Sequence, residues 1–518
     1  MSSEEYTTIM EKEYEEACSM ENRYAFLNAN LFPMLSKEEQ GILMDMQEKF
    51  KKYQKDVKTM KDVYEIFPKL GENYLLQRLN PHKEIDGSTR LQMLLCLCST
   101  QLSPEVDMAM AASAILAGNA LCHMHPATDV VEKAKDEIFS GKKVGCIGIT
   151  EMDHGSDAVN MEVMSKINDD GSLTMNGTKI YTTNGPKADY FVAYGVTDLL
   201  DPRHSMTQGL FTREHGVKTE RLRIPAAPRV HIGKTIFENV TCPKDYVLAG
   251  PGVGYKRLFE GLVPERLTIV GSSIGGAWAA LATAVNFTQI RIQFGKPLFS
   301  YQGISHVIAD LFSHVSAYSS FAFQIAEFYE KKIADVKRKG QTPNKMDEMY
   351  AAVLASQAKY LTAKGAHYGA YELVQVMGGR GALDEPGTNL IINQLENLSR
   401  ISEVVGGHRN VQLMIVEGAL RAASGMSISR QIKKMGKKEV GKAEVRAKLM
   451  IEKANVMLAQ KDKLGEVAAD LEKAKGEFEA AIASGDPKKA EFYAKALGKG
   501  LSEAGKAIYK ADKKEAAE

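Results

Sequence analysis

The 518-residue chain lacks several features that would place it in common classes of protein. Its 66 basic residues are balanced by 65 acidic ones, so it has no basic surplus of the kind that nucleic-acid binding needs. No stretch of about 20 residues is both apolar and free of charge, so no membrane span is predicted. The acidic first segment, MSSEEYTTIMEKEYEEAC, resembles neither a secretory signal nor an Arg-rich transit peptide, and we therefore expect a cytoplasmic protein.

Cysteine and histidine are sparse and poorly arranged for metal binding. None of the six cysteines forms a CxxC pair, which indicates buried free thiols in a reducing compartment. His123 and His125 stand two residues apart, a poor spacing for two ligands on one helical face, so no metal site is predicted. No GxGxxG motif follows a predicted strand, which argues against a Rossmann nucleotide site.

What the chain does contain is a change of pattern along its length. Helical spacing of apolar residues dominates up to about residue 140, including a capping box at Ser36 and Glu39. Runs rich in β-branched and aromatic residues, separated by turn signals such as NDDG and NGPK, then indicate a small antiparallel sheet or barrel. Long amphipathic segments return after the Gly/Pro cluster AGPGVG.

The last hundred residues are rich in Ala, Lys and Glu and contain no catalytic motif. Asp486 and Pro487 begin a helix after a turn, so the interpretations are a helical hairpin or a solvated charged arm. Segregated helical and strand blocks predict the α+β class. The predicted segments are an N-terminal extension (1–33), an N-terminal α-helical domain (34–142), a middle β domain (143–248), a C-terminal α-helical domain (249–423) and a helical extension (424–518).

Four motifs then point to one family. They are GITEMDHGSD (148–157), KIYTTNGPKADYF (179–191), RIQFGKPLFSYQ (291–302) and QVMGGRG (375–381). In their order and spacing they resemble the acyl-CoA dehydrogenases, over about residues 34–423. The resemblance implies a helical N-terminal domain, a middle β-barrel or sheet domain and a C-terminal helical bundle. It also implies FAD as cofactor and an acyl-CoA as substrate.

The resemblance assigns two groups of residues to FAD. The first group, which would hold the flavin ring and the pyrophosphate, is Ile147, Ile149, Thr150, Ser156, Tyr181 and Thr183. Tyr181 stands where many members carry a Trp, and the alternative for it is an aromatic in the core of a strand. The second group, which would reach FAD from a neighbouring subunit or in the C-terminal loop, is Arg291, Phe294, Gln302, Gln375, Gly378 and Gly379. A homo-oligomer, a tetramer or a dimer, follows from this division; a solvated helix charge is the alternative for Arg291.

The catalytic base departs from the usual family pattern. Most members carry a Glu in an EGT motif, but here the segment GGHRNVQ places Gly406 on the Glu, Gly407 on the Gly and His408 on the Thr. One branch, which includes isovaleryl-CoA dehydrogenase, takes its base from an earlier helix instead. The segment LVPERLTIVG resembles that helix, with Glu265 as the base and Arg266 as the arginine that binds the acyl-CoA.

Alternatives remain open for these residues. Glu265 is otherwise an ion pair or a surface acid at a helix start, and Pro264 can kink the helix and displace its carboxylate. Glu403 is the rival base, three residues before Gly406. His408 is either a second proton carrier or a polar contact to FAD. Ser156, Arg266, Gly406 and Gly407 are expected at the substrate, and the segment PHKEIDGSTR (81–90) replaces a Gly-rich loop common in the family.

The predicted reaction is FAD-dependent α,β-dehydrogenation of an acyl-CoA thioester. Glu265 would abstract the α-proton, the β-hydride would pass to flavin N5, and electrons would leave to an electron-transfer flavoprotein. A short branched or alicyclic acyl group is favoured by the placement of the base. Two other hypotheses stand beside it: an oxidase, reductase, decarboxylating or elimination reaction on the same fold, and a non-catalytic flavin-binding assembly subunit.

Overall fold

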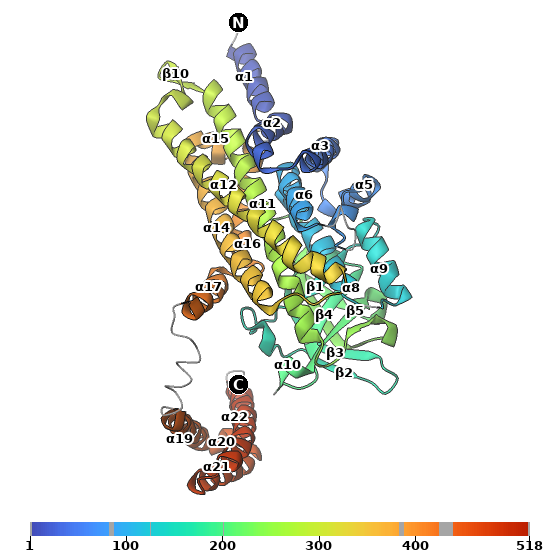
Figure 1. Cartoon of the computed structure of the whole chain (residues 1–518), viewed down its shortest axis with the longest axis vertical. Coiled ribbons are helices and arrows are strands. Elements are labelled where there is room, and N and C mark those ends of the chain that lie inside the picture. Colours follow the sequence, from blue (N-terminus) through green and yellow to red (C-terminus); the bar gives the residue numbers. More distant parts are fainter. Residues whose placement is uncertain are drawn as a thin grey trace. The chain divides into compact units, whose positions relative to one another are not determined.

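The computed structural model describes residues 3–81, 88–124, 126–199, 201–382, 388–423 and 439–515 (Figure 1). His125 and residues 82–87, which include most of the segment 81–90, lie outside them. The chain forms two compact units, Met1–Glu417 and Gly418–Glu518.

The first unit opens with helices. They are α1 (Ser3–Ala17), α2 (Met20–Leu31), α3 (Lys37–Lys51), α4 (Gln54–Thr59), α5 (Phe67–Glu72), α6 (Thr89–Leu102), α7 (Pro104–Met110), α8 (Asn119–Cys122) and α9 (Asp129–Phe139). The predicted capping box is present, with the Ser36 hydroxyl accepting from the Glu39 N–H and the Glu39 carboxylate from the Ser36 N–H. A π-helical segment, Ala111–Gly118, joins α7 to α8.

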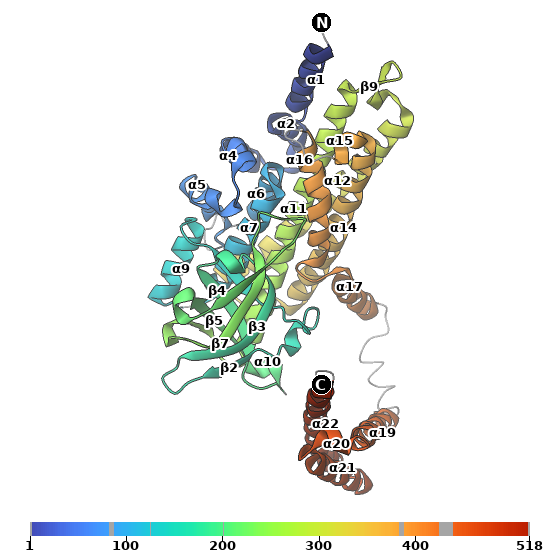
Figure 2. The same cartoon turned by 180° about the vertical axis from the view of Figure 1, so that it is seen from behind.

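An eight-stranded sheet follows in the described part of the chain (Figure 2). Its strands are β1 (Gly145–Gly148), β2 (Met164–Ile167), β3 (Leu173–Thr183), β4 (Tyr190–Val196), β5 (Met206–Thr212), β6 (Lys218–Leu222), β7 (Ile232–Cys242) and β8 (Val247–Ala249), with the short helix α10 (Pro202–Ser205) between β4 and β5. The order is β6-β7-β3-β2-β4-β5-β8, and β1 pairs in parallel with β4. Gly145 opens β1 against the π-helical segment, where its N–H donates to Ser113 Oγ at 2.9 Å. This contact fixes the sheet against the N-terminal helices.

The C-terminal helices pack around the long helix α11, which contacts α6, α12, α14 and α16. The elements are α11 (Gly254–Ile290), β9 (Ile292–Gln293), β10 (Lys296–Pro297), α12 (Gln302–Tyr329), α13 (Asp335–Arg338), α14 (Lys345–Met377), α15 (Gly379–Ala382), α16 (Thr388–Val404) and α17 (Arg409–Ala423). Figures 1 and 2 show β9, β10 and α15 at the end of this bundle remote from the sheet. Nearly every residue of α6 is buried, because α6 lies between α3 and α11.

Two helical stretches are long and apolar enough to cross a membrane, Pro104–Cys122 and Gly254–Ile290. In both, 78% of the apolar window is buried inside the protein, as expected of core helices. The six cysteines are also buried, and none of them forms a disulfide, as predicted from their spacing.

The second unit contains α19 (Glu439–Leu458), α20 (Lys461–Leu464), α21 (Val467–Ala483) and α22 (Pro487–Glu515). The predicted turn at Asp486 is present, and Pro487 begins α22. Because only three residues connect α21 to α22, the two helices pack as a hairpin. α19 covers the hairpin, and Leu471, Phe478 and Leu497 lie in the small core between the helices. The helical-hairpin interpretation of the tail therefore holds for the described residues.

Candidate active site

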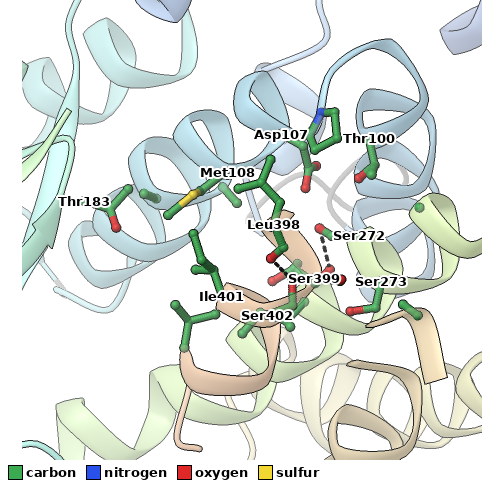
Figure 3. Close-up of a pocket in the computed structure, with 18 of the residues that line it drawn as sticks. Thr100, Asp107, Met108, Thr183, Ser272, Ser273, Leu398, Ser399, Ile401 and Ser402 are labelled. Carbon is green, nitrogen blue, oxygen red and sulfur yellow. Dashed lines mark hydrogen bonds between the residues drawn. The ribbon is translucent and has the colours of Figure 1, made fainter. Parts of the chain in front are cut away.

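A cavity opens among α7, the π-helical segment, α11 and α16, with Thr183 of β3 at its edge (Figure 3). It contains about 900 Å³ of space, its open mouth included. One face of α11 lines it at the spacing of a helical stripe, with Glu265, Thr268, Ile269, Ser272, Ser273 and Gly276.

Glu265 stands at the junction of this cavity and a smaller one. The smaller cavity is lined by Ile147 and Ile149 from the start of the sheet, by Tyr194 and by the first turns of α11. Burial raises the pKa of Glu265 from 4.5 to about 7, against the opposing effect of the nearby cations Arg266 and Lys359. A carboxyl with this pKa is half ionised near neutrality, so it can both take and return a proton there.

Gly406 directly faces this carboxyl. A β-carbon built on Gly406 would lie 3.6 Å from Oε1 of Glu265 and only 2.8 Å from Cδ1 of Ile269. Gly406 also has φ of +66°, a left-handed conformation that favours glycine. Gly406, which follows α16, and the carboxyl of Glu265 on α11 are therefore neighbours in the folded protein.

Three buried side chains hold the loop around Gly406. Lys359 of α14 donates from Nζ to the carbonyls of Glu403 and Gly407, both at 2.9 Å. Gln412 donates to the carbonyls of Gly406 and Gly407, at 2.9 and 2.7 Å. Arg266 reaches the Gly406 carbonyl at 3.4 Å and Ser356 Oγ at 3.4 Å. These contacts fix the loop against the α11 carboxyl.

The rival residues have other partners. The carboxylate of Glu403 is hydrogen-bonded to Nδ1 of His367 at 2.6 Å. Glu403 does not line the cavity. His408 Nδ1 accepts the N–H of Asn410 at 3.1 Å, so the imidazole caps the start of α17. Both residues thus have local structural roles, and Glu265 is the carboxyl next to Gly406.

Pro264 neither begins nor breaks α11. It lies inside the helix, where Thr268 Oγ1 donates to the carbonyl of Glu265 at 2.7 Å and to that of Pro264 at 3.2 Å. The helix continues through the proline, and Glu265 lies on the cavity-facing stripe. The displacement considered above does not occur.

The β-side residues fall into two groups. Ile147, Ile149 and Thr183 line the two cavities that Glu265 joins, whereas Ser156 is exposed on its loop. Thr150 accepts the N–H of Ile180 through its carbonyl at 2.9 Å. Beneath this loop the buried Lys179 pairs with Glu151 at 2.6 Å and donates to the Ile149 carbonyl at 3.1 Å. The ion pair anchors the loop to β3.

Tyr181 is not the core aromatic of the alternative interpretation. Its ring is 59% exposed, and its φ of +57° is rare for a residue with a β-carbon. The strand pairing shifts register between Lys179 and Thr182, which turns Tyr181 outward. The strained backbone of Tyr181 thus leaves its aromatic ring exposed, two residues before Thr183.

The remaining predicted FAD residues lie far from Glu265 in the same chain. Arg291 follows the last turn of α11, 26 residues after Glu265, which corresponds to about 40 Å along a helix. Phe294 in the β9–β10 hairpin is 95% exposed, and Gln302, Gln375, Gly378 and Gly379 are also exposed. Arg291 is exposed too, and its guanidinium donates to the Tyr14 hydroxyl at 3.5 Å. These residues cannot share one bound molecule with Glu265 of their own chain unless that molecule spans the bundle.

Lys359 and Asp107 were not predicted. Lys359 is a lone lysine in the Ala-rich run AAVLASQAKYL, on the same helical face as Ala351, Ala355 and Thr362, which was a signal of burial. Asp107 is buried on the cavity wall, in the same short helix as the buried Glu105. In the described ranges, no group of three or more His, Cys, Asp or Glu residues could hold a metal ion.

Two family models match most of the first unit from the sheet onward. The family model "Acyl-CoA dehydrogenase, middle domain" matches residues 146–240, and "Acyl-CoA dehydrogenase, C-terminal domain" matches 252–420. A short-chain specific acyl-CoA dehydrogenase of Megasphaera elsdenii is 30% identical over 294 residues, which are 56% of this chain and 71% of that protein. The chain belongs to the acyl-CoA dehydrogenase family.

Other relatives extend the match. The mitochondrial isovaleryl-CoA dehydrogenase of Oryza sativa is 27% identical over 359 residues, 67% of this chain and 81% of that protein. The structure of butyryl-CoA dehydrogenase from Megasphaera elsdenii superposes with a TM-score of 0.65 at 25% identity, covering 74% of this chain and 98% of that one. The predicted fold and the predicted enzyme class, an oxidoreductase of this family, are confirmed.

Proposed function

We propose that this acyl-CoA dehydrogenase uses FAD to oxidise the Cα–Cβ bond of an acyl-CoA, with Glu265 as the base that takes the α-proton. The observation that supports Glu265 most directly is its contact with Gly406. The position where most members carry the base is here a glycine, and the carboxyl on α11 occupies the space next to it. One carboxylate is thereby kept at the reaction centre.

The residues around Glu265 suit an α-proton transfer. The cavity wall is mostly apolar, which raises the pKa of the carboxyl and makes it a stronger base once ionised. Arg266 and Lys359 supply positive charge on the side away from the cavity and limit that rise. Gly406 and Gly407 add no side chain beside the carboxyl, so they place no bulk in the way of a thioester.

The chain also fits FAD. Thr150 and Thr183 would hold the polar edge of the flavin, Ile147 and Ile149 its apolar part, and the outward-turned Tyr181 would stack on the ring. The unusual exposure and backbone conformation of Tyr181 are the structural evidence for this fit. When bound, FAD would accept the hydride that leaves the β-carbon.

A second protomer would complete the cofactor site. Arg291, Phe294, Gln302, Gln375, Gly378 and Gly379 lie too far along the bundle to reach the flavin of their own chain. An exposed arginine can bind two pyrophosphate oxygens, and the fully exposed Phe294 offers an apolar contact to a partner. We therefore propose a homo-oligomer, a tetramer or a dimer, in which each subunit donates these residues to its neighbour.

The substrate proposal is a short branched or alicyclic acyl-CoA, in the manner of the isovaleryl-CoA dehydrogenase branch. Placing the base on α11 leaves only Gly406 after α16, beside Glu265, and Ala111, Ala112 and Gly276 are small residues on the cavity wall. Together they leave width for a branched or cyclic group near the reacting carbons. The proposed electron acceptor is an electron-transfer flavoprotein, and the proposed location is the cytoplasm.

The test is an anaerobic titration of the purified protein with butyryl-, isovaleryl-, cyclohexanecarboxyl- and palmitoyl-CoA, following the flavin absorbance. The short and branched thioesters are expected to bleach the flavin and to yield the 2-enoyl-CoA, identified by mass spectrometry. Palmitoyl-CoA is expected to bleach it more slowly. If no thioester perturbs the flavin, acyl-CoA dehydrogenation is not the function.

A further inference from the structure

The helix α1 lies at the end of the bundle that carries the two motifs expected to serve a neighbouring subunit's FAD. Figures 1 and 2 both show α1 at the same end of the first unit as β9, β10 and α15. The family models match residues 146–240 and 252–420, so α1 lies outside both of them. Its contacts therefore indicate its role.

The C-terminal end of α1 is anchored on α11. Asn286 Nδ2 donates to the Ala17 carbonyl at 2.8 Å, and the rings of Tyr14 and Phe287 pack with their centroids 5.3 Å apart. The side chain of Tyr14 is buried, with 3% exposure. Because close packing holds a buried ring in one orientation, its hydroxyl and its faces meet fixed neighbours.

Two arginines, one from each motif, contact the ring of Tyr14. Arg291, which follows α11, donates to the hydroxyl at 3.5 Å. Arg380 of α15 has its Cζ 4.9 Å from the ring centroid, within the range of a cation–π interaction. Because both guanidiniums contact one ring, α1 brings together two cations that are 89 positions apart in the sequence.

The two cations lack an acidic partner in the described part of the chain. Neither Arg291 nor Arg380 forms an ion pair with a described Asp or Glu. Like charges held near each other repel, and an anion that bonds both of them relieves the repulsion. A guanidinium is planar and forms two parallel hydrogen bonds to phosphate oxygens. A diphosphate offers oxygens on two phosphorus atoms, so it can bond both arginines at once.

We propose that Arg380 joins Arg291 in binding the pyrophosphate of a neighbouring subunit's FAD, and that Tyr14 of α1 is the residue that positions both. The inference rests on the proposed function, which gives Arg291, Gln375 and Gly379 to the neighbour's cofactor. Arg380 follows Gly379 directly and extends that set by one residue. The N-terminal extension is thereby a supporting part of the cofactor site in the oligomer.

The test measures the binding of FAD and of riboflavin to the apoprotein through the change in flavin fluorescence. Riboflavin carries the flavin ring but no phosphate, so a contact to the pyrophosphate affects the binding of FAD alone. We expect Arg380→Gln to weaken FAD binding by about tenfold or more, the usual size of a hydrogen bond to a charged group. Riboflavin binding should stay within about twofold of the native value.

Two variants of Tyr14 separate the ring from the hydroxyl. Tyr14→Phe keeps the ring against Arg380 but removes the acceptor of Arg291, so FAD binding should weaken by about threefold. Tyr14→Leu removes both contacts and should weaken FAD binding by about tenfold or more. Tyr493→Phe, which deletes a hydroxyl in the second compact unit, is the matched control and should change neither affinity.

The salt dependence of FAD binding is a second measurement, which decides the question if riboflavin binds too weakly to be measured. Salt screens the attraction between guanidinium and pyrophosphate, so the native affinity for FAD should fall between about 20 mM and about 500 mM KCl. The fall should be smaller in Arg380→Gln and in Tyr14→Leu, because these variants have lost part of that attraction.

The outcomes separate this inference from the function on which it rests. A loss of FAD binding without loss of riboflavin binding, in an oligomer of native size by light scattering, supports the inference. If Arg380→Gln and Tyr14→Leu bind FAD as the native protein does, the inference alone is overturned. Equal loss of both flavins, or loss of the native oligomer, also overturns it, because that result shows a purely structural role. Bleaching of the native flavin by acyl-CoA tests the function independently.

Discussion

Oε1 of Glu265 lies 3.6 Å from the position that a β-carbon on Gly406 would occupy. Glu265 lies on α11 and Gly406 in the turn after α16, 141 positions later in the sequence, and a β-carbon on Gly406 would collide with Ile269 of α11 at 2.8 Å. The backbone of Gly406, with φ of +66°, favours glycine independently of this contact. The pairing of a carboxyl on α11 with a glycine after α16 is thus both a steric and a conformational requirement.

Replacing the proposed base should separate catalysis from cofactor binding. Glu265→Gln keeps the size of the side chain but cannot accept the α-proton. We expect the variant to bind FAD and to lose substrate-dependent bleaching by about 10²–10⁴-fold in rate, the usual contribution of a positioned base. Stopped-flow absorbance under anaerobic conditions measures the rate.

Glu403→Gln is the control for that experiment, since Glu403 lies four residues before Gly407 but bonds His367 outside the cavity. It should leave the bleaching rate within about threefold of the native value, because its carboxyl is not expected to touch the substrate. Native-like bleaching in Glu265→Gln, with loss in Glu403→Gln, would reverse the assignment.

The pH dependence of turnover should follow the ionisation of Glu265. Its pKa is raised by burial to about 7, and only the carboxylate can accept a proton. We therefore expect kcat/KM to rise with pH, to reach half its plateau near pH 7, and to fall about tenfold for each pH unit below it. A profile that stays flat from pH 5 to pH 8 would show that a group of ordinary acidity is the base.

The same pKa shift has a consequence for stability. The folded protein holds the Glu265 proton more tightly than the unfolded chain does, with pKa values of about 7 and 4.5. Stability from this group is therefore full below pH 4.5 and falls as pH rises toward 7, by about 3 kcal/mol in all. Glu265→Gln, compared at equal FAD loading, should be more stable than the native protein at pH 8 and should lose that advantage near pH 4.5. Denaturant unfolding at the two pH values measures the difference.

Gly406→Ala should damage both stability and rate. The added methyl would meet Ile269 at 2.8 Å and would force a left-handed backbone on alanine, at a cost of about 1–3 kcal/mol. Because relief of the clash moves the loop against Glu265, we also expect flavin bleaching to slow by about tenfold or more. Gly303→Ala is the matched control, since a β-carbon there meets nothing within 4 Å and its φ is not positive. Equal behaviour of the two variants would contradict the steric argument.

The fold, and the meeting of Glu265 with Gly406, could be predicted from the sequence because both depend on local patterns. Segregated helical and strand periodicities predict the α+β order, and the Pro-Glu-Arg segment with GGHRNVQ indicates Glu265 and Gly406 together. Pro264 seemed a threat to this arrangement because proline removes one helical hydrogen bond. The helix α11 nevertheless continues through Pro264, from Gly254 to Ile290, which no pattern of apolar residues displays.

Other parts of the site could not be predicted, for a physical reason. Lys359 bonds two backbone carbonyls that are 44 and 48 residues away, and main-chain acceptors leave no signature in side-chain identity. Tyr181 matched the motif, but its outward turn depends on a register shift between β3 and β7, which is set by strand pairing. Asp107 faces α11 only because α7 and α11 pack together in three dimensions.

Lys359 should affect both the pKa of Glu265, through its charge, and the stability of the loop that contains Gly406, through its hydrogen bonds. Lys359→Met removes a buried cation that lowers the pKa of Glu265, so the midpoint of the kcat/KM profile should move to higher pH. It also leaves the carbonyls of Glu403 and Gly407 without this donor, which should cost about 2–4 kcal/mol of stability. Lys364→Met, an exposed lysine on the same helix, is the control and should change neither quantity. An unchanged pH midpoint in Lys359→Met would leave the lysine with a purely structural role.

Removal of the second unit should leave the chemistry intact. Gly418–Glu518 has its own core, formed by residues such as Leu471, Phe478 and Leu497, and every residue assigned above to the base, the flavin or the substrate precedes Gly418. A chain truncated after residue 423 is therefore expected to retain the native FAD content and, with a soluble dye as electron acceptor, to keep kcat/KM within about twofold. Flavin absorbance and dye reduction measure the two quantities. A truncated chain that folds, by circular dichroism, but has lost FAD or turnover would show that the tail contributes to the site.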